Sequence, residues 1–369
     1  MRKIILSFFA TALSAAAFSQ ITLTQLPSGG NKKATVGERV GLTDVTIHYD
    51  RPAVKGREGK VWGQLVHTGY TDQGFGSSKS APWRAGANEN TVIEFSDDVM
   101  VEGKPLKAGR YGFFIAYDSV ESTVIFSSNS TSWGSYYYND KEDVLRVKVK
   151  PVRLNNSVER LRFEFFDQTE NSAMIGLQWE RLMIPFKVET DYIKQQIASF
   201  RNELRTSKGF YWLPWDQAAQ WCLQRNVNLE EALLWADTAS GPTFGGAALF
   251  GPQATKAGIL SKLGRQAEAD ALMKASLPLA NMQEIHQYGR SLLAQKKTKE
   301  ALEVFQLNFK RNPNQFTTLA GLTRGYSANG DFKNALKYAE LAKPLAPNEP
   351  NKKFIDEAIA KLKKGQDIN

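Results

Sequence analysis

The sequence predicts an α+β chain of two domains, an all-β sandwich or barrel followed by an α-helical solenoid. Short runs of alternating apolar and polar residues fill the first half. Near Thr190 this alternation gives way to apolar residues at helical spacing. Further on, Ala301 and Pro313 recur 34 residues later as Ala335 and Pro347. A fixed period of this length is typical of two-helix repeats that bury their apolar faces by stacking on their neighbours.

The β domain is predicted over residues 20–188. Val45, Ile47 and Tyr49 alternate with polar residues, which predicts a half-buried strand that ends before Pro52. Further strands are expected at residues 91–95, 99–101, 105–106, 111–116, 123–127, 144–150, 160–166, 173–179 and 182–188. Many short strands separated by turn residues favour a sandwich or a barrel.

The helical domain is predicted over residues 189–369. Ile193, Ile197, Phe200 and Leu204 follow the spacing of one helical face, with Thr190 as the expected N-cap. Helical pairs are expected to the end of the chain, and a last helix at residues 352–363 would cover the array with a polar face.

The 34-residue period and the Gly-Asp-Phe turn at residues 330–332 resemble tetratricopeptide repeats. This resemblance implies a peptide or protein partner. Aligned on the repeat, Arg290 and Arg324 occupy the same place in successive first helices, where they would face the concave groove. Two stacked guanidiniums favour an acidic group between them. The alternative, which we weigh more heavily from the sequence alone, is that both are solvated surface arginines.

The first residues predict export. Arg2 and Lys3 precede an apolar run at residues 4–17, and small residues at Ala17 and Ser19 suit cleavage before Gln20. Residues 1–19 are therefore expected to be a signal peptide, and the mature chain is expected to be soluble and periplasmic or secreted. No later stretch is long enough for a membrane span.

The charge and the cysteine count narrow the classes of partner. The chain has a net charge of +9 but no arginine-rich tract with interleaved aromatic residues, and an exported protein is not expected to meet nucleic acid. Cys222 is the only cysteine, so no disulfide framework forms within the chain. We expect a buried core thiol there rather than a nucleophile.

Two segments carry the densest group of unusual residues. The first contains Tyr-Asp-Arg-Pro at 49–52 and Lys-Gly-Arg at 55–57, and the second contains Trp-Arg-Ala-Gly-Ala-Asn-Glu at 83–89. A shorter stretch, Gly-Arg-Tyr, follows at 109–111. This set resembles the bacterial family called domain of unknown function 2911, with Asp50 in place of its usual Ser and Ala85 in place of Thr. The resemblance covers roughly residues 35–188, and a helical repeat tail is common in exported Bacteroidetes members. It implies no activity.

The same segments predict a ligand-binding site or a structural network, and both interpretations stay open. Guanidiniums grip carboxylates or phosphates, and indole faces stack on sugars or cations, so a saccharide or a small anion is one possible ligand. In the other interpretation Arg84 pairs with Glu89 or Asp50, while Trp62 and Trp83 lie in the core. The candidate residues are Arg51, Lys55, Arg57, Trp83, Arg84, Asn88 and Glu89. A run of tyrosines at 136–138 is either a sugar platform or, as we expect, a strand that buries alternate rings.

Catalytic chemistry has little support. His48, His67 and His286 show no metal-ligand spacing, and no nucleophile elbow is present, so no catalytic residue, metal or cofactor is predicted. A hydrolase acting through His48 with Asp50 and a serine is the third hypothesis. The sequence predicts first a non-catalytic binding protein, second a saccharide- or anion-binding module, and third this hydrolase.

Overall fold

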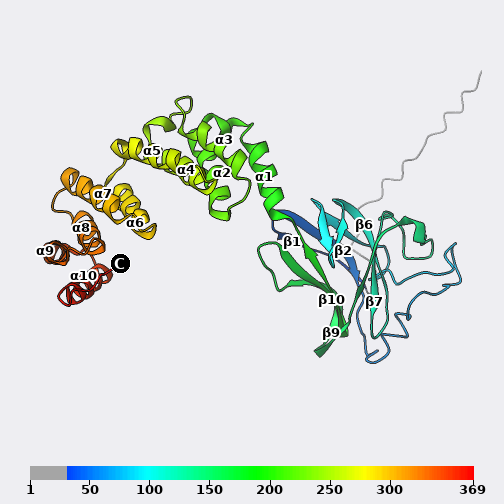
Figure 1. Ribbon diagram of the computed structural model, residues 1–369. Coiled ribbons are helices and arrows are strands. Elements are labelled where there is room, and N and C mark those ends of the chain that lie inside the picture. Colours follow the sequence, from blue (N-terminus) through cyan, green and yellow to red (C-terminus); the bar gives the residue numbers. More distant parts are fainter. Residues whose placement is uncertain (1–30) are drawn as a thin grey trace, which may run out of the picture. The chain divides into compact units, whose positions relative to one another are not determined.

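The structure is a computed structural model that describes residues 31–369, so the predicted signal peptide lies outside the described residues. The chain divides into two compact units, with the boundary between Gln196 and Ile197. Figure 1 labels several strands of the first unit and the helices of the second. Each unit is described by itself.

The first unit is built from two antiparallel sheets. One sheet has the order β1-β2-β3-β6-β7-β8, and the other has the order β5-β4-β10-β9. The strands of the larger sheet are β1 (Lys32–Val40), β2 (Thr43–Arg51), β3 (Thr91–Phe95), β6 (Gly109–Ala116), β7 (Ser122–Ser127) and β8 (Asp143–Val149). Those of the smaller sheet are β4 (Val99–Val101), β5 (Lys104–Leu106), β9 (Val152–Phe166) and β10 (Ser172–Glu189), and a short 3-10 helix, η1 (Asp140–Glu142), precedes β8.

The core lies between the two sheets. Phe113 of β6 packs against Phe163 of β9 and Phe186 of β10, with ring centroids 5.7 and 5.4 Å apart. Tyr49 of β2 packs edge-on against Phe163 at 4.9 Å. Burying each of these side chains contributes about 1.5–3 kcal/mol to folding. Interlocking rings from both sheets confirm the predicted sandwich.

Three predictions for this unit need correction. The first strand, β1, was not predicted, because its residues are mostly exposed and it pairs only with β2. The two strands predicted at 173–179 and 182–188 are one strand, β10, which bulges at Glu180, where φ is +51°. The tyrosine run at 136–138 is not a strand: Tyr136 and Tyr137 lie in a turn in which Gly134 adopts a φ of +73°, and Tyr138 follows it with its hydroxyl donating to Asp143.

A long segment, residues 52–90, joins β2 to β3 and carries little regular structure. Short bridges hold it to the sandwich: Trp83 pairs with Ile115 of β6, and the Gly69 N–H donates to the Tyr117 carbonyl at 2.6 Å. The Glu180 carboxylate at the β10 bulge accepts the Gly59 N–H at 2.6 Å. The loop is therefore held in place by isolated contacts rather than by a continuous series of strand-pairing hydrogen bonds.

The second unit consists of helices that follow one another in pairs. Its first helix, α1 (Tyr192–Glu203), crosses the boundary of the two units, and its N-cap is Asp191, whose carboxylate accepts the Lys194 N–H at 3.0 Å. Thr190, the predicted cap, is buried. The remaining helices are α2 (Trp212–Arg225), α3 (Leu229–Ser240), α4 (Phe250–Lys262), α5 (Gln266–Ser276), α6 (Met282–Ala294), α7 (Thr298–Arg311), α8 (Phe316–Ala328), α9 (Phe332–Ala342) and α10 (Glu349–Leu362). Short 3-10 turns lie at Ser207–Phe210, Gly246–Ala248, Leu277–Leu279 and Lys343–Leu345.

The 34-residue period is visible in the packing. Ala301 of α7 and Ala335 of α9 are both fully buried. The ring of Phe305, one turn after Ala301, fills the space left by two glycines: a Cβ on Gly289 of α6 or Gly321 of α8 would approach it to 2.5 or 2.6 Å. Glycines on the two neighbouring helices therefore let α6 and α8 approach α7 closely. The helical unit is a tetratricopeptide-like array, as predicted.

Candidate functional site

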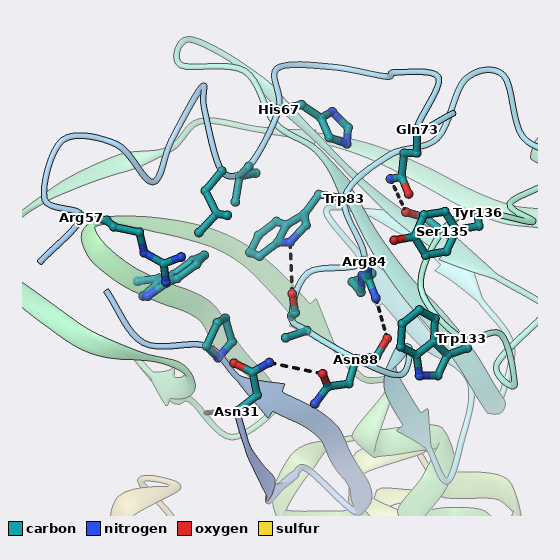
Figure 2. Close-up of a pocket in the computed structure, with 16 residues that line it drawn as sticks. Asn31, Arg57, His67, Gln73, Trp83, Arg84, Asn88, Trp133, Ser135 and Tyr136 are labelled. Carbon is teal, nitrogen blue, oxygen red and sulfur yellow. Dashed lines mark hydrogen bonds between the residues drawn. The ribbon is translucent and has the colours of Figure 1, made fainter. Parts of the chain in front are cut away.

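A pocket of about 550 Å³ opens where the 52–90 loop meets the turn at residues 133–136 (Figure 2). It brings together four of the predicted site residues: Arg57, Trp83, Arg84 and Asn88. Further lining residues come from the loop, from β10 and from the segment before β1; they are Asn31, Pro52, Leu65, Val66, His67, Gln73, Gly86, Ala87, Trp133, Ser135, Tyr136 and Trp179.

Asn88 joins the two motif segments. Its backbone adopts a φ of +55°, which asparagine tolerates better than most residues. Its side chain accepts from Asn31 Nδ2 at 3.2 Å and donates to Asp50 Oδ1 at 3.3 Å, while its carbonyl accepts from Arg84 Nη1 at 2.6 Å. Two segments far apart in the sequence therefore meet at one end of β2.

The other predicted site residues lie away from this pocket. Arg51 donates from Nε to the Leu161 carbonyl at 2.9 Å, which ties β2 to β9. Lys55 is exposed, at a φ of +51°. Glu89 is exposed and pairs with Lys33. These three residues lie outside the lining of the pocket.

The predicted pairing of Arg84 is wrong. Lys33 of β1 binds Glu89 and also lies 3.6 Å from the buried carboxylate of Asp50. Those contacts raise the pKa of Lys33, the hydrogen bond with Glu89 contributing most. Because the nearby carboxylates are already paired, Arg84 turns instead to the Asn88 carbonyl and to two aromatic rings.

Trp83 and Trp179 line the pocket. Trp83 stacks on Trp179 with ring centroids 6.1 Å apart and an interplanar angle of 19°, and Trp62 meets both rings edge-on. The Trp83 indole donates to the Gly86 carbonyl at 3.2 Å. These contacts confirm that Trp62 and Trp83 pack into the β core, where Trp83 also presents an edge to the pocket.

Several lining residues were not among the predicted site residues. Trp133 and Tyr136 stack at 6.0 Å and 11°, and Gln73 Nε2 donates to Ser135 Oγ at 3.0 Å. Burial lowers the pKa of His67, whose ring nitrogens make no hydrogen bond of good geometry. The tyrosine run in the sequence could have pointed to Tyr136 as a lining residue. The loop at residues 69–80, which contributes Gln73, is marked in the sequence only by its glycine and serine content.

The arginines predicted for the groove are Arg290 on α6 and Arg324 on α8, and they lie close enough for the charge of Arg290 to act on Arg324. Gln283 of α6 donates from Nε2 to Thr317 Oγ1 of α8 at 3.2 Å. These two residues occupy equivalent positions of the repeat, and each lies two helical turns before the arginine of its own helix. The Arg324 guanidinium lies 4.2 Å from the centre of the Phe354 ring. Burial lowers the pKa of Arg324, and the nearby positive charge of Arg290 lowers it further. Neither arginine has a carboxylate partner within residues 31–369.

His286 precedes Arg290 by one turn of α6 and lies within reach of the charges of both arginines. Burial and the charges of Arg290 and Arg324 lower its pKa to about 4, so the imidazole is neutral at pH 7. Its Nδ1 is buried without a hydrogen-bond partner.

A groove of about 690 Å³ lies on α2, α4, α5 and α6. Its base is apolar, with Leu223, Phe250, Met273 and Tyr288, and exposed glutamine side chains surround that base. The glutamines are Gln220, Gln266, Gln283, Gln287 and Gln295.

The hydrolase hypothesis finds a partial counterpart on the exposed face of the larger sheet. His48 Nδ1 lies 2.9 Å from Thr35 Oγ1, and His48 Nε2 lies 3.8 Å from Glu94, which Arg110 also binds. Thr35 and His48 are directly paired in the β1–β2 ladder. The hydroxyl belongs to a threonine rather than a serine, and Asp50, the expected carboxylate, binds Lys33 instead.

Two other features bear on chemistry. Cys222 is fully buried, and burial raises the pKa of its thiol to about 11, which disfavours a nucleophilic thiolate at neutral pH. Within residues 31–369 no cluster of histidine, cysteine and acidic side chains is suited to a metal ion.

No helix in that part of the chain is long and apolar enough to span a membrane.

Comparison with known proteins agrees with the two-unit description. Residues 31–188 match the model of a family described as protein of unknown function, DUF2911, which confirms the resemblance seen in the motifs. No curated protein matches the chain.

Solved structures match the helical half. YrrB, described as a TPR protein with an unusual peptide-binding site, is 16% identical, with 46% of this chain and 86% of that chain covered and a TM-score of 0.32. MamA from Desulfovibrio magneticus RS-1 is 19% identical, with 46% and 94% covered and a TM-score of 0.29. Both likenesses are weak, so the helical assignment rests on the repeat geometry of this chain.

Proposed function

We propose that the helical unit binds a peptide or protein partner along the face formed by α2, α4, α6 and α8, with an acidic group of the partner between Arg290 and Arg324. The observation that carries this proposal is the arginine pair itself, which lies beside a groove and has no carboxylate partner in the described chain.

The groove has the chemistry that an extended peptide needs. An apolar base of Phe250, Met273 and Tyr288 accepts side chains. The exposed amides of Gln287 and Gln295 offer both donors and acceptors, which match the alternating N–H and C=O groups of a peptide backbone.

Arg290 extends this surface toward α8. Gln283, Gln287 and Arg290 follow one another at i, i+4 and i+7, so they share a face of α6. On α8, Thr317 and Arg324 repeat the positions of Gln283 and Arg290. A carboxylate between the two guanidiniums would relieve their mutual repulsion and accept charge-assisted hydrogen bonds.

The test is selection of a binding peptide from a randomised library on the full chain, followed by titration of that peptide. The double variant Arg290→Ala, Arg324→Ala should weaken binding at least tenfold, and added salt should weaken binding to the unsubstituted chain because exposed charges are screened over ~8–10 Å.

The matched control removes the same charge from α9. Lys333→Ala with Lys337→Ala should leave the affinity unchanged, since neither residue lies on the α6–α8 face. If the arginine and lysine variants weaken binding equally, only general charge attraction is at work and the proposed site is wrong.

We also propose that the chain is exported with residues 1–19 removed, and that residues 20–188 and 189–369 fold as separate domains. The charged start, the apolar run and the small residues before Gln20 support export. N-terminal sequencing of the protein from its native cells tests it: a mature chain that still begins at Met1 would refute cleavage.

A further inference from the structure

The pocket of the β unit carries positive charge without a counter-charge. Arg57 and Arg84 both line it, and its lining contains neither aspartate nor glutamate. Neither arginine forms a salt bridge within residues 31–369, while Asp50 and Glu89 are both taken by Lys33. Half-buried charges are normally paired, so this pocket favours a ligand that brings a negative charge.

Arg84 is the better placed of the two arginines. Arg57 donates from Nε and Nη2 to the carbonyls of Val54 and Ala53, so its guanidinium serves mainly to fold the loop. Arg84 makes one hydrogen bond within the described chain, from Nη1 to the Asn88 carbonyl. That bond fixes the guanidinium and leaves other N–H groups for a carboxylate.

Two aromatic rings stand over Arg84. Its Cζ atom lies 5.4 Å from the centre of the Trp133 ring and 5.5 Å from that of Tyr136. A side chain at Gly134 would collide with the guanidinium, since its Cβ would lie 2.8 Å from Nη1. The turn therefore positions both rings, and Trp133 remains 59% exposed despite its size.

Polar groups surround the same space. Figure 2 shows His67, Gln73 and Ser135 along one margin and Asn88 and Asn31 along the other, with Arg84 between the two margins. The indole nitrogen of Trp179, a lining residue that is 99% buried, makes no hydrogen bond in the described chain, and the ring nitrogens of His67 make none of good geometry. Such groups suit a ligand with several hydroxyls.

We propose that this pocket binds an acidic sugar unit, a uronic acid, with its carboxylate on Arg84 and its ring face on the Trp133–Tyr136 pair. The arginine accounts for the acid, the exposed aromatic pair for a ring, and the polar margins for hydroxyl groups. An aromatic acid would leave those margins unpaired, and a neutral sugar would leave Arg84 without a counter-charge. This site is independent of the peptide groove.

The proposal is tested by calorimetric titration of the full chain with glucuronate, glucose, benzoate and inorganic phosphate. Glucuronate should bind at least tenfold more tightly than each of the other three. Equal binding of glucose would remove the role of Arg84, and tighter binding of benzoate or phosphate would overturn the sugar assignment. Absence of glucuronate binding would overturn the whole proposal.

Two variants locate the site. Arg84→Gln and Trp133→Ala should each weaken glucuronate binding at least tenfold, while Arg153→Gln, which removes the same charge from an exposed position on β9, should not. Because Arg84 also holds the Asn88 loop, thermal unfolding of each variant is measured first. Trp133→Ala decides the matter if Arg84→Gln unfolds, since most of the Trp133 ring is exposed. Unchanged binding in Trp133→Ala would contradict the proposal.

Discussion

The groove of the helical unit and the pocket of the β unit position their side chains in opposite ways. In the groove, helical register places Gln283, Gln287 and Arg290 on one face, and the 34-residue period repeats that face on α8. In the pocket, the key residues lie on irregular loops held by single hydrogen bonds, such as the one from Arg84 to the Asn88 carbonyl.

This difference determines how each site tolerates change. A regular helix keeps its direction when one surface side chain is replaced, so groove variants should affect binding alone. A loop fixed by individual contacts couples binding to stability, because the same residue contacts ligand and holds backbone. Trp83 and Trp133, neighbours in one pocket, separate these two roles.

The largest expected effect is at Trp83. Trp83→Ala removes a buried ring that stacks on Trp179 and an indole donor to Gly86, and it should lower the free energy of unfolding by about 3–5 kcal/mol. Trp133→Ala, at an exposed ring of the same pocket, should cost less than about 0.5 kcal/mol. Urea denaturation followed by tryptophan fluorescence compares them. Equal losses would show that the exposed ring is also a structural element.

In the helical unit, the tight approach of α6 to α7 is the most sensitive point. Gly289→Ala should destabilise this unit by about 1–3 kcal/mol, because its Cβ would lie 2.5 Å from the fully buried ring of Phe305. Gly251→Ala is the matched control in α4, where a Cβ meets nothing within 4 Å. It should be neutral or slightly stabilising. Loss of the helical circular dichroism signal in urea measures both, and a harmless Gly289→Ala would mean that the repeats pack less closely.

A smaller effect is expected from pH. The pKa of His286 is lowered to about 4 in the folded state, whereas an unfolded histidine titrates near ~6.5. Between these values the unfolded chain binds more protons, so stability is complete above about pH 6.5 and falls as the pH is lowered toward 4, by about 1–3 kcal/mol. His286→Gln should flatten this dependence in urea denaturation of the helical unit.

The control for the pH effect is His48→Gln, which changes an exposed imidazole of the β unit. It should leave the pH dependence of the helical transition as it was. If His286→Gln behaves in the same way, another group accounts for the loss of stability at low pH.

The smallest effect concerns the contact that aligns α6 with α8. Gln283→Ala removes the hydrogen bond to Thr317, which is exposed and should contribute about 0.5–1.5 kcal/mol. Thr298→Ala, which breaks an exposed bond between α7 and Asn329, is the comparison. Similar small losses in both would show that glycine–phenylalanine packing, rather than polar contacts, sets the repeat geometry.

The sequence predicted most of the helical unit because its information is periodic. Ala301 and Ala335 mark equivalent buried positions, and the alignment that they define carries Arg290 onto Arg324. In the β unit, alternation predicted the strands on the sandwich core but missed β1, whose side chains are mostly exposed.

The pocket was only partly predictable for a different reason. The motif residues Arg57, Trp83, Arg84 and Asn88 do converge there. The partners of Arg84 could not be inferred, because they depend on Lys33 binding both nearby carboxylates and on the turn at Gly134. These contacts join distant segments, and no local spacing encodes them.

The most direct test of the two-site account is a crossed titration of the full chain with glucuronate and with a library-selected peptide. We expect Arg84→Gln to weaken only glucuronate, and Arg290→Ala with Arg324→Ala to weaken only the peptide, each at least tenfold. Saturation with one ligand should leave the affinity for the other unchanged. If either variant weakens both ligands equally, or if the ligands compete, the chain does not carry two separate sites.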